Sequence, residues 1–537
     1  MSANPETLAS TNATNQYKRS SDRVLKELEA RELVFAVVGP AGSGTSQIAT
    51  ALSEQAAELG NAVEVNIIKA SAVIQEWADH KGLGISTDNL LLRAELLQDA
   101  GDRMRSEDVT KVALGLVKKI RKLRDTSEEN RQRTSQPGKQ PFRVYILDSL
   151  KHPAEVELLR RVYREAFCLV GVVCETEKRR QRLTDAKGKK STTEDVERFI
   201  ERDEDAGVKH GQKVAEAFHL ADFFADNTAD RLENGKENQN WDVNEQLGRL
   251  LNILTHATLC RPTPAETGMF HAYSAQLRSA CLSRQVGAAL MDSQGNLLST
   301  GTNEVPRAGG GVYGGAFSDS EYDDSGDYRC AKYKKFCRNT RTAHEIVKEL
   351  IEAIPQLNGA DPSKLYSQVK KTSVGGLLEF SRAVHAEMDA LLSAARQGAS
   401  PVGGRLFTTT FPCHYCARHI VSAGVDEVQY IEPYPKSRAL ELHGDAITDK
   451  SKDWVPPSSD TNNPKKSTVL FRPFTGVAPR MYQRAFFKDR KLKDGEGTMS
   501  VQEPEWISGL LKESYQDIEK VLLGIGANDE QAYGDDS

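Results

Sequence analysis

The chain has 537 residues, of which 71 are lysine or arginine and 76 are aspartate or glutamate, so its formal net charge is −5. At about 150 residues a domain, this length predicts roughly three to four domains. The nearly balanced charge excludes a strongly basic protein that wraps nucleic acid. The sequence contains no run of about 18 apolar residues, which a transmembrane helix would need.

The N-terminus and the cysteines indicate the compartment. The first twenty residues are polar and lack the apolar stretch of a signal peptide, and eight cysteines are too sparse for a disulfide scaffold. We therefore expect a cytoplasmic protein with no membrane contact, whose cysteines are thiols unless a metal holds them.

The first half of the chain has an α/β pattern. Residues 1–30 contain almost nothing that could join a core, so we expect a disordered tail that leads into a short helix. Residues 31–250 alternate apolar runs with amphipathic helices, which is typical of a parallel sheet covered by helices. The segments 125–141 and 234–240 are expected to be surface loops. The expected strands are 33–38, 63–68, 142–147 and 168–173, and the expected helices are 46–59, 88–98, 107–124 and 154–166.

A glycine loop with the spacing Gly-x-x-x-x-Gly lies between the first of these strands and the first helix, as in a P-loop. Its backbone N–H groups favour a bound anion, but Thr45 stands where a phosphate-binding lysine is expected. We therefore expect ATP or another nucleotide, with Mg²⁺, to bind there, while catalysis is less well supported. An ordinary tight glycine turn is the alternative. The candidate residues are Gly39, Gly42, Gly44, Thr45, Ser46 and, at a Walker B position, Asp148.

A second α/β unit is expected over residues 251–455. Its pattern is a helix, a hairpin, a long insert over 304–342, and then helix, strand, helix and strand. The insert is rich in glycine and acidic residues, so it is expected to cover or flank a site or to be a plain solvated loop. Residues 456–537 are expected to form a C-terminal extension. The expected elements are helix 265–283, strands 286–291 and 297–301, a helix beyond 382, strand 405–409, helix 413–423 and strand 427–431.

The strongest chemical signal is His385-Ala-Glu387 followed by Pro412-Cys413-His-Tyr-Cys416. Two thiolates from a Cys-x-x-Cys at a helix start and one histidine can hold Zn²⁺. Three protein ligands leave a fourth position for water, as in catalytic zinc sites, and Glu387 would then take and deliver protons without binding the metal.

A structural zinc knuckle, or a buried histidine near an unrelated cysteine pair, is the alternative interpretation of this segment. It would leave the His-x-Glu spacing and the flanking proline unexplained. We interpret His414 and His419 as non-ligands, and Cys330 and Cys337 in the insert as free thiols.

The residues His385, Glu387, Pro412, Cys413 and Cys416 resemble the signature of the zinc-dependent cytidine deaminase superfamily, in which the glutamate is the catalytic proton carrier. The resemblance predicts a deaminase fold for the second unit, with helices on both faces of a central sheet.

Three further segments, 279–288, 301–306 and 432–437, resemble the deoxycytidylate deaminase family. This resemblance, over about residues 270–445, implies that Asn303, Tyr434 and Lys436 contact the substrate. A turn residue or a rim aromatic is the alternative for each. Glu304 replaces a glycine of the family pattern, and its charge near a phosphate leaves the number of phosphates on the substrate open.

The order of the two units resembles the bacterial anti-phage dCTP/dCMP deaminases, a P-loop kinase-like domain fused to a deaminase domain. Arg179, Arg180 and Arg182 also resemble the arginine-rich lid of nucleoside-monophosphate and dephospho-coenzyme A kinases. The resemblance implies deamination of free dCTP or dCMP, depletion of deoxycytidine nucleotides during infection, an inhibitor in resting cells, and a homo-oligomer.

Two other functions stay open at this point. A deaminase that edits tRNA or single-stranded DNA would use basic residues such as those in segment 118–124 to contact phosphates, although the net charge argues against it. A nucleotide-sensing regulatory protein with a vestigial enzyme is the third hypothesis, and the intact metal-binding residues argue against that one.

Overall fold

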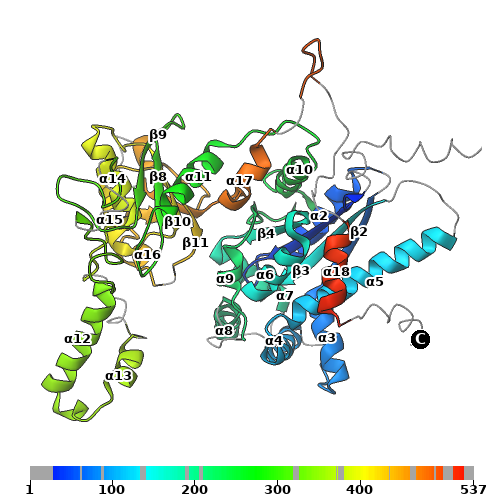
Figure 1. Ribbon diagram of the computed structural model, residues 1–537, viewed down its shortest axis with the longest axis horizontal. Coiled ribbons are helices and arrows are strands. Elements are labelled where there is room, and N and C mark those ends of the chain that lie inside the picture. Colours follow the sequence, from blue (N-terminus) through cyan, green and yellow to red (C-terminus); the bar gives the residue numbers. More distant parts are fainter. Residues whose placement is uncertain are drawn as a thin grey trace, which may run out of the picture. The chain divides into compact units, whose positions relative to one another are not determined.

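The computed structural model describes residues 28–60, 63–85, 90–133, 141–187, 193–204, 210–317, 326–370, 372, 380–434, 436–459, 467–488, 492–499 and 512–524 (Figure 1). It divides the chain into two compact units, one formed by residues 1–260 together with 488–537 and the other by residues 261–487. Both are α/β, which confirms the predicted fold class. Most of the expected tail, 1–30, lies outside the described residues.

The first unit is built on a parallel sheet in the order β5-β4-β1-β3-β2. β1 and β4 are buried along their whole length because helices cover both faces, which explains their continuous apolar sequences. The strands are β1 (Glu32–Val38), β2 (Val63–Lys69), β3 (Phe142–Leu150), β4 (Phe167–Val173) and β5 (Phe223–Asp226). The helices are α2 (Thr45–Ala57), α3 (Ala70–His80), α4 (Leu90–Glu107), α5 (Lys111–Arg133), α6 (Pro153–Tyr163), α7 (Thr176–Lys187), α8 (Thr193–Glu204), α9 (Val214–Phe218) and α10 (Val243–Leu254).

Two segments of this unit that were expected to be loops contain helix or strand residues. The loop predicted over 125–141 was wrong up to Arg133, because α5 continues through a run of glutamate, glutamine and arginine, all good helix formers. Its end is held by Ser127, which donates to Glu64 at 2.7 Å. Segment 234–240 contains a turn between β6 (Leu232–Glu233) and β7 (Lys236–Glu237), which form a short exposed hairpin.

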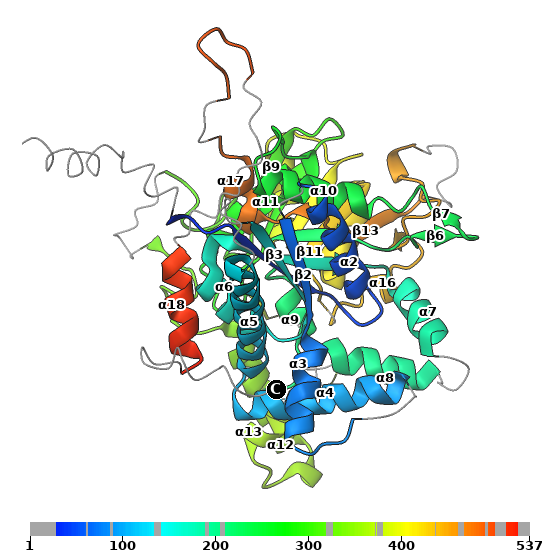
Figure 2. The same ribbon diagram turned by 90° about the vertical axis from the view of Figure 1, so that its right-hand side faces the viewer.

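A buried charge network joins the C-terminal helix α18 (Lys512–Leu522) to α5 and α6 of the first unit (Figures 1 and 2). Arg124 donates to Glu32 at 2.9 Å and to Glu519 at 2.7 Å. Tyr515 donates to Glu32 and Tyr163 to Glu519, each at 2.7 Å. Burial alone would raise the pKa of Glu32, but Arg124, Tyr515 and Arg143 together outweigh it, and the pKa is lowered.

The second unit is built on a mixed sheet in the order β12-β13-β11-β10-β8-β9. β8 is antiparallel to both β9 and β10, and the other neighbours are parallel. Its strands are β8 (Gly287–Met291), β9 (Leu297–Thr302), β10 (Arg405–Thr410), β11 (Glu427–Glu432), β12 (Ile447–Thr448) and β13 (Val469–Pro473). The short strand β14 (Gly476–Val477) follows β13 in the sequence and is not part of this sheet. The helices are α11 (Pro264–Leu277), α12 (Arg338–Ala353), α13 (Pro362–Val369), α14 (Ala386–Arg396), α15 (His414–Ala423), α16 (Ala439–Leu442) and α17 (Pro479–Phe486).

Helices cover both faces of this sheet, with α11 on one face and α14 on the other (Figure 1). A side-chain carbon on Gly287 would lie 2.0 Å from the carbonyl oxygen of Ala272 in α11. One on Gly301 would lie 2.0 Å from the carbonyl oxygen of Ala386 in α14. These two glycines let the helices approach the strands at the positions that bring the site residues together.

The boundaries of this unit differ from the expected ones at three places. α11 ends at Leu277 and not at 283, because Ser279 turns the chain by donating to the carbonyl of Asn303 at 2.7 Å. α12 begins inside the expected insert. The expected extension 456–537 is divided between the units, since β13 pairs with β11 whereas α18 belongs to the first unit. No described helix is both long and apolar enough to cross a bilayer.

We expect Glu519→Gln to destabilise the first unit by about 3 kcal/mol, because removing one partner leaves buried Arg124 under-compensated. The free energy of unfolding in urea measures the loss. Asp517→Asn on the same helix is the matched control, since its side chain is 71% exposed and its pairing with Lys520 is long, at 3.8 Å. The control should change stability by less than about 0.5 kcal/mol. Equal stabilities of the two variants would contradict the role of the network.

Candidate active site

Two helix N-termini bring His385, Cys413 and Cys416 together. His385 is the N-cap of α14, Cys413 is the N-cap of α15, and Cys416 lies in the first turn of α15. The Nδ1 atom of His385 lies 3.3 Å from the Sγ atom of Cys413 and 3.4 Å from that of Cys416. All three donor atoms lie within 4.8 Å of one another.

Local hydrogen bonds fix the residues that precede these donors. Glu304 and Val384 exchange two backbone hydrogen bonds, with N···O distances of 3.3 and 2.9 Å, directly before His385. The hydroxyl of Ser437 donates to the carbonyl of Pro412 at 2.7 Å, directly before Cys413. The three donors are therefore held by backbone that is itself anchored.

The donor set fits a zinc ion. Ligands of tetrahedral zinc with bonds of about 2.0–2.3 Å lie about 3.5 Å from one another, close to the separations found here. A hydrogen bond with Cys416 and the neighbouring His385 lower the pKa of the Cys413 thiol to about 4, which favours the thiolate form that binds zinc. A hydrogen bond with Cys413 raises the pKa of His385 to about 9. Metal binding would release that proton, since only neutral histidine is a ligand.

Glu387 lies in the first turn of α14, two residues beyond His385, and its side chain is only 4% exposed. Burial raises the pKa of this carboxyl group. Its carboxylate is not among the three grouped donors. The structure thus places a buried carboxyl group beside the metal-binding atoms without making it a fourth ligand.

A polar rim lies next to these donors and includes two of the predicted substrate contacts. Asn303 donates through Nδ2 to the carbonyl of Arg284 at 2.8 Å, while its buried Oδ1 has no hydrogen-bond partner among the described residues. The Arg284 guanidinium pairs with Glu432 and lies 5.8 Å from the ring centre of Tyr434. Arg284 was missed as a site residue, because the expected helix to 283 left it without a defined position.

Lys436, the third predicted substrate contact, is exposed, whereas Glu304, which departs from the family pattern, is buried. Lys436 lies two residues beyond Tyr434. The Glu304 carboxylate is buried and accepts from the backbone N–H groups of Ala280 at 2.7 Å and Val305 at 2.9 Å. Because these donors compensate its charge, Glu304 repels a substrate phosphate less than the sequence suggested.

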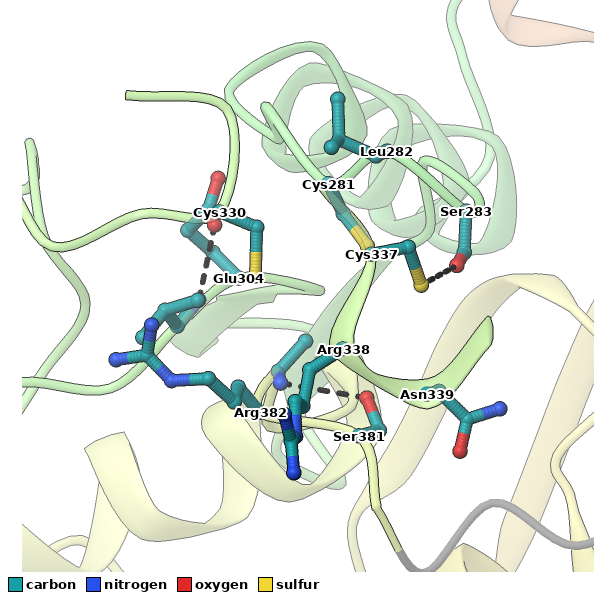
Figure 3. A pocket seen from close by; sticks show the side chains of 12 residues that line it. Cys281, Leu282, Ser283, Glu304, Cys330, Cys337, Arg338, Asn339, Ser381 and Arg382 are labelled. Carbon is teal, nitrogen blue, oxygen red and sulfur yellow. Dashed lines mark hydrogen bonds between the residues drawn. The ribbon is translucent and has the colours of Figure 1, made fainter. Parts of the chain in front are cut away.

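The insert borders a small pocket of about 20 Å³ beside Glu304 (Figure 3). Cys330 and Cys337 line it, and neither forms a disulfide. Ser283 and Cys337 lie within hydrogen-bond distance, with Oγ and Sγ 3.1 Å apart. The described part of the insert therefore lies against the segments that contain Ser283 and Glu304.

The glycine loop of the first unit contains two glycines with left-handed backbone conformations. Gly42 and Gly44 have positive φ angles of 80° and 84°, and Gly44 is the N-cap of α2. Ser46 donates to Asp148 at 2.6 Å, and the hydroxyl groups of Thr45 and Ser149 are 2.7 Å apart. Ser46 of the glycine loop and Asp148 at the predicted Walker B position thus lie in contact near the C-terminal ends of β1 and β3.

Two of the arginines that resemble a kinase lid, Arg180 and Arg182, donate hydrogen bonds to acceptors of the protein itself. Arg180 donates to Glu197 of α8 at 2.6 Å. Arg182 donates to the carbonyl of Asn227 at 2.8 Å and to Asp230 at 3.0 Å. These contacts hold α7 against its surroundings and do not leave the two guanidinium groups directed at a ligand.

Comparison with known proteins agrees with the metal-binding geometry. Residues 262–432 match the family of the cytidine and deoxycytidylate deaminase zinc-binding region, and this stretch contains His385, Glu387, Cys413 and Cys416. The chain is 28% identical over 176 residues to the deoxycytidylate deaminase of Enterobacteria phage T4, which covers 32% of this chain and 80% of that protein.

Two weaker similarities were also found. The chain is 28% identical over 197 residues to a UPF0200/UPF0201 protein of Archaeoglobus fulgidus, covering 36% of this chain and 50% of that protein. The crystal structure of the apo dCMP deaminase of cyanophage S-TIM5 aligns over 40% of this chain and 100% of its own, with 18% identity and a TM-score of 0.21, too low to compare the folds.

We expect Gly301→Ala to lower the zinc content of the purified protein, because the added carbon would meet the carbonyl of Ala386 and push α14 away from β9. The zinc-to-protein ratio and the melting temperature measure the effect. Gly326→Ala is the control, since Gly326 has open space and an ordinary φ. Full zinc content in the Gly301 variant would show that the close approach does not position His385.

Proposed function

We propose that the chain removes the amino group of deoxycytidine nucleotides by hydrolysis, releasing ammonia and the deoxyuridine nucleotide. The observation that carries this proposal is the grouping of one imidazole nitrogen and two cysteine sulfurs beside a buried glutamate. His385, Cys413 and Cys416 would hold the zinc ion. When bound, zinc supplies an activated water molecule as the nucleophile for C4 of the base.

Glu387 is the proposed proton carrier. Its position in the first turn of α14 keeps it next to His385, and its burial keeps bulk water from exchanging protons with it. Glu387 would take a proton from the attacking water and deliver it to N3 of the cytosine ring. It would then take the second proton from the hydroxyl group formed at C4 and deliver it to the amino group, which leaves as ammonia while C4 becomes a carbonyl. The carboxyl group ends the cycle in the state in which it began.

The rim residues support a nucleotide substrate. The unpartnered Oδ1 atom of Asn303 would accept a hydrogen bond from a sugar hydroxyl, since leaving a buried acceptor unpaired costs free energy. Tyr434 offers a ring face at the rim, and exposed Lys436 offers a positive charge for phosphate. Mono- and triphosphate substrates, dCMP and dCTP, are both compatible with these residues.

The nucleic-acid editing hypothesis receives less support from the basic face of α5. Lys119 pairs with Glu76 at 2.6 Å, Arg121 lies 3.6 Å from Asp125, and Arg124 is buried in the charge network. Several cations of this segment are therefore already paired. Comparing ammonia release from dCMP, dCTP and a cytosine-containing oligonucleotide tests the choice, and faster release from the oligonucleotide would favour editing.

The glycine loop is the proposed site of a regulatory nucleotide such as ATP with Mg²⁺. The loop conformation and the Ser46–Asp148 contact support it. A cytoplasmic location, a homo-oligomer, depletion of deoxycytidine nucleotides in anti-phage defence and an inhibitor in resting cells remain predictions of the family resemblance.

We expect Glu387→Gln to retain zinc and the fold but to lose ammonia release by more than about a hundredfold, because no other carboxyl group moves the proton. Ammonia release from dCMP and the zinc-to-protein ratio are measured together. Glu352→Gln on the exposed surface of α12 is the matched control and should be fully active. Appreciable turnover by the Glu387 variant would contradict the proposed role.

We expect Asn303→Ala to raise KM for dCMP about tenfold with unchanged zinc content, because the substrate loses one hydrogen bond in a buried setting. Initial rates at varied dCMP concentration measure it. Asn358→Ala, at an exposed position of the same unit, is the control. An unchanged KM would remove Asn303 from the substrate site.

A further inference from the structure

We propose that Lys151 is the phosphate-binding cation of the glycine loop and that Asp203 competes with phosphate for that position. The inference rests on the proposed nucleotide binding at Gly39–Ser46 and adds to it one ligand-contacting side chain and one competing anion. The sequence offered no cation there, because Thr45 replaces the expected lysine and its hydroxyl lies 2.7 Å from that of Ser149.

The loop is closely packed and contains a buried hydroxyl group without a partner. A side-chain carbon on Gly42 would lie 2.6 Å from the carbonyl of Arg179, and one on Gly44 would lie 2.4 Å from the side-chain nitrogen Nδ2 of Asn227, so only glycine fits at either position. Ser43 is 0% exposed and its hydroxyl, which lies close to Gly39, has no hydrogen-bond partner among the described residues. A buried hydroxyl group without a partner is suited to donate to a ligand oxygen.

Lys151 follows β3 directly and reaches the start of the loop. Its Nζ atom lies 3.3 Å from the carbonyl oxygen of Gly39 and 2.9 Å from Oδ1 of Asp203. The lysine is thus contributed by the end of a neighbouring strand rather than by the first turn of α2. An ammonium group at this edge can contact a phosphate held by the loop.

Asp203 of α8 already occupies part of the position that a phosphate would take. It is 2% exposed, and its Oδ2 atom accepts from the backbone N–H of Ala41 at 2.8 Å while Oδ1 contacts Lys151. One carboxylate therefore bridges a loop N–H group and an ammonium group, the two kinds of donor that a P-loop offers to phosphate. A bound phosphate would take over both donors, and Asp203 would have to move away from the loop.

A simpler role for Lys151 is to neutralise buried Asp203, and a double variant separates the two roles. Binding of ATP with Mg²⁺ to the full chain is measured by equilibrium dialysis for wild type, Lys151→Met, Asp203→Asn and the double variant. The Asp203→Asn change keeps an oxygen acceptor for the N–H of Ala41 and removes only the charge. Lys119→Met, which removes an exposed ion pair with Glu76, is the matched lysine control, and melting temperatures check folding.

We expect Asp203→Asn to bind ATP about fivefold more tightly and Lys151→Met about tenfold more weakly than wild type. The double variant should bind about tenfold more weakly than Asp203→Asn. Equal affinity of the double variant and Asp203→Asn would show that Lys151 only compensates Asp203 and would overturn the inference. Unchanged affinity in Asp203→Asn would overturn the competition.

The proposed nucleotide binding fails in a different way. Gly44→Val blocks the loop, so binding that this variant retains lies elsewhere. Two results would show that the loop is not a nucleotide site: no ATP binding by wild type and Asp203→Asn, or binding that Gly44→Val leaves unchanged. Either result would also overturn the inference about Lys151.

Discussion

The site of the second unit depends on the meeting of two helix N-termini around one imidazole and two thiols. Unpaired backbone N–H groups give each N-terminus a partial positive charge, which stabilises the thiolate of Cys413 at the start of α15. The same geometry places Glu387 in the first turn of α14, next to the metal-binding atoms. Gly301 makes the meeting possible, because any larger residue would separate β9 from α14.

The metal-binding part of this site could be predicted from the sequence because its information is local. His-x-Glu and Pro-Cys-x-x-Cys each define one helix start, and the ligand types define the metal. Arg284 could not be predicted as a rim residue, since its position depends on where α11 ends and on the bond from Ser279 to Asn303. Lys151 and Asp203 carry no motif, and Asp203 meets Ala41 across 162 residues of sequence.

The sheets were predictable for a similar reason. Buried strands such as β1 and β4 are continuous apolar runs, whereas the end of α5 has the polar composition of a loop and is helical through residue propensity and contacts with Glu64. The division of the C-terminal segment had no local signal. From the sequence, the segment of β13 was expected to belong to a C-terminal extension, but it pairs with β11 inside the second unit.

The helix α18 has a consequence for the order in which the protein is made. Glu519 and its partner Arg124 are separated by 395 residues, and the whole second unit lies between them. A ribosome therefore releases every strand of the second unit's sheet before it releases the helix that completes the first unit. Nascent chains pass through a stage in which Arg124 is translated but lacks Glu519, so chaperone contact and proteolysis during synthesis would concentrate on the N-terminal unit.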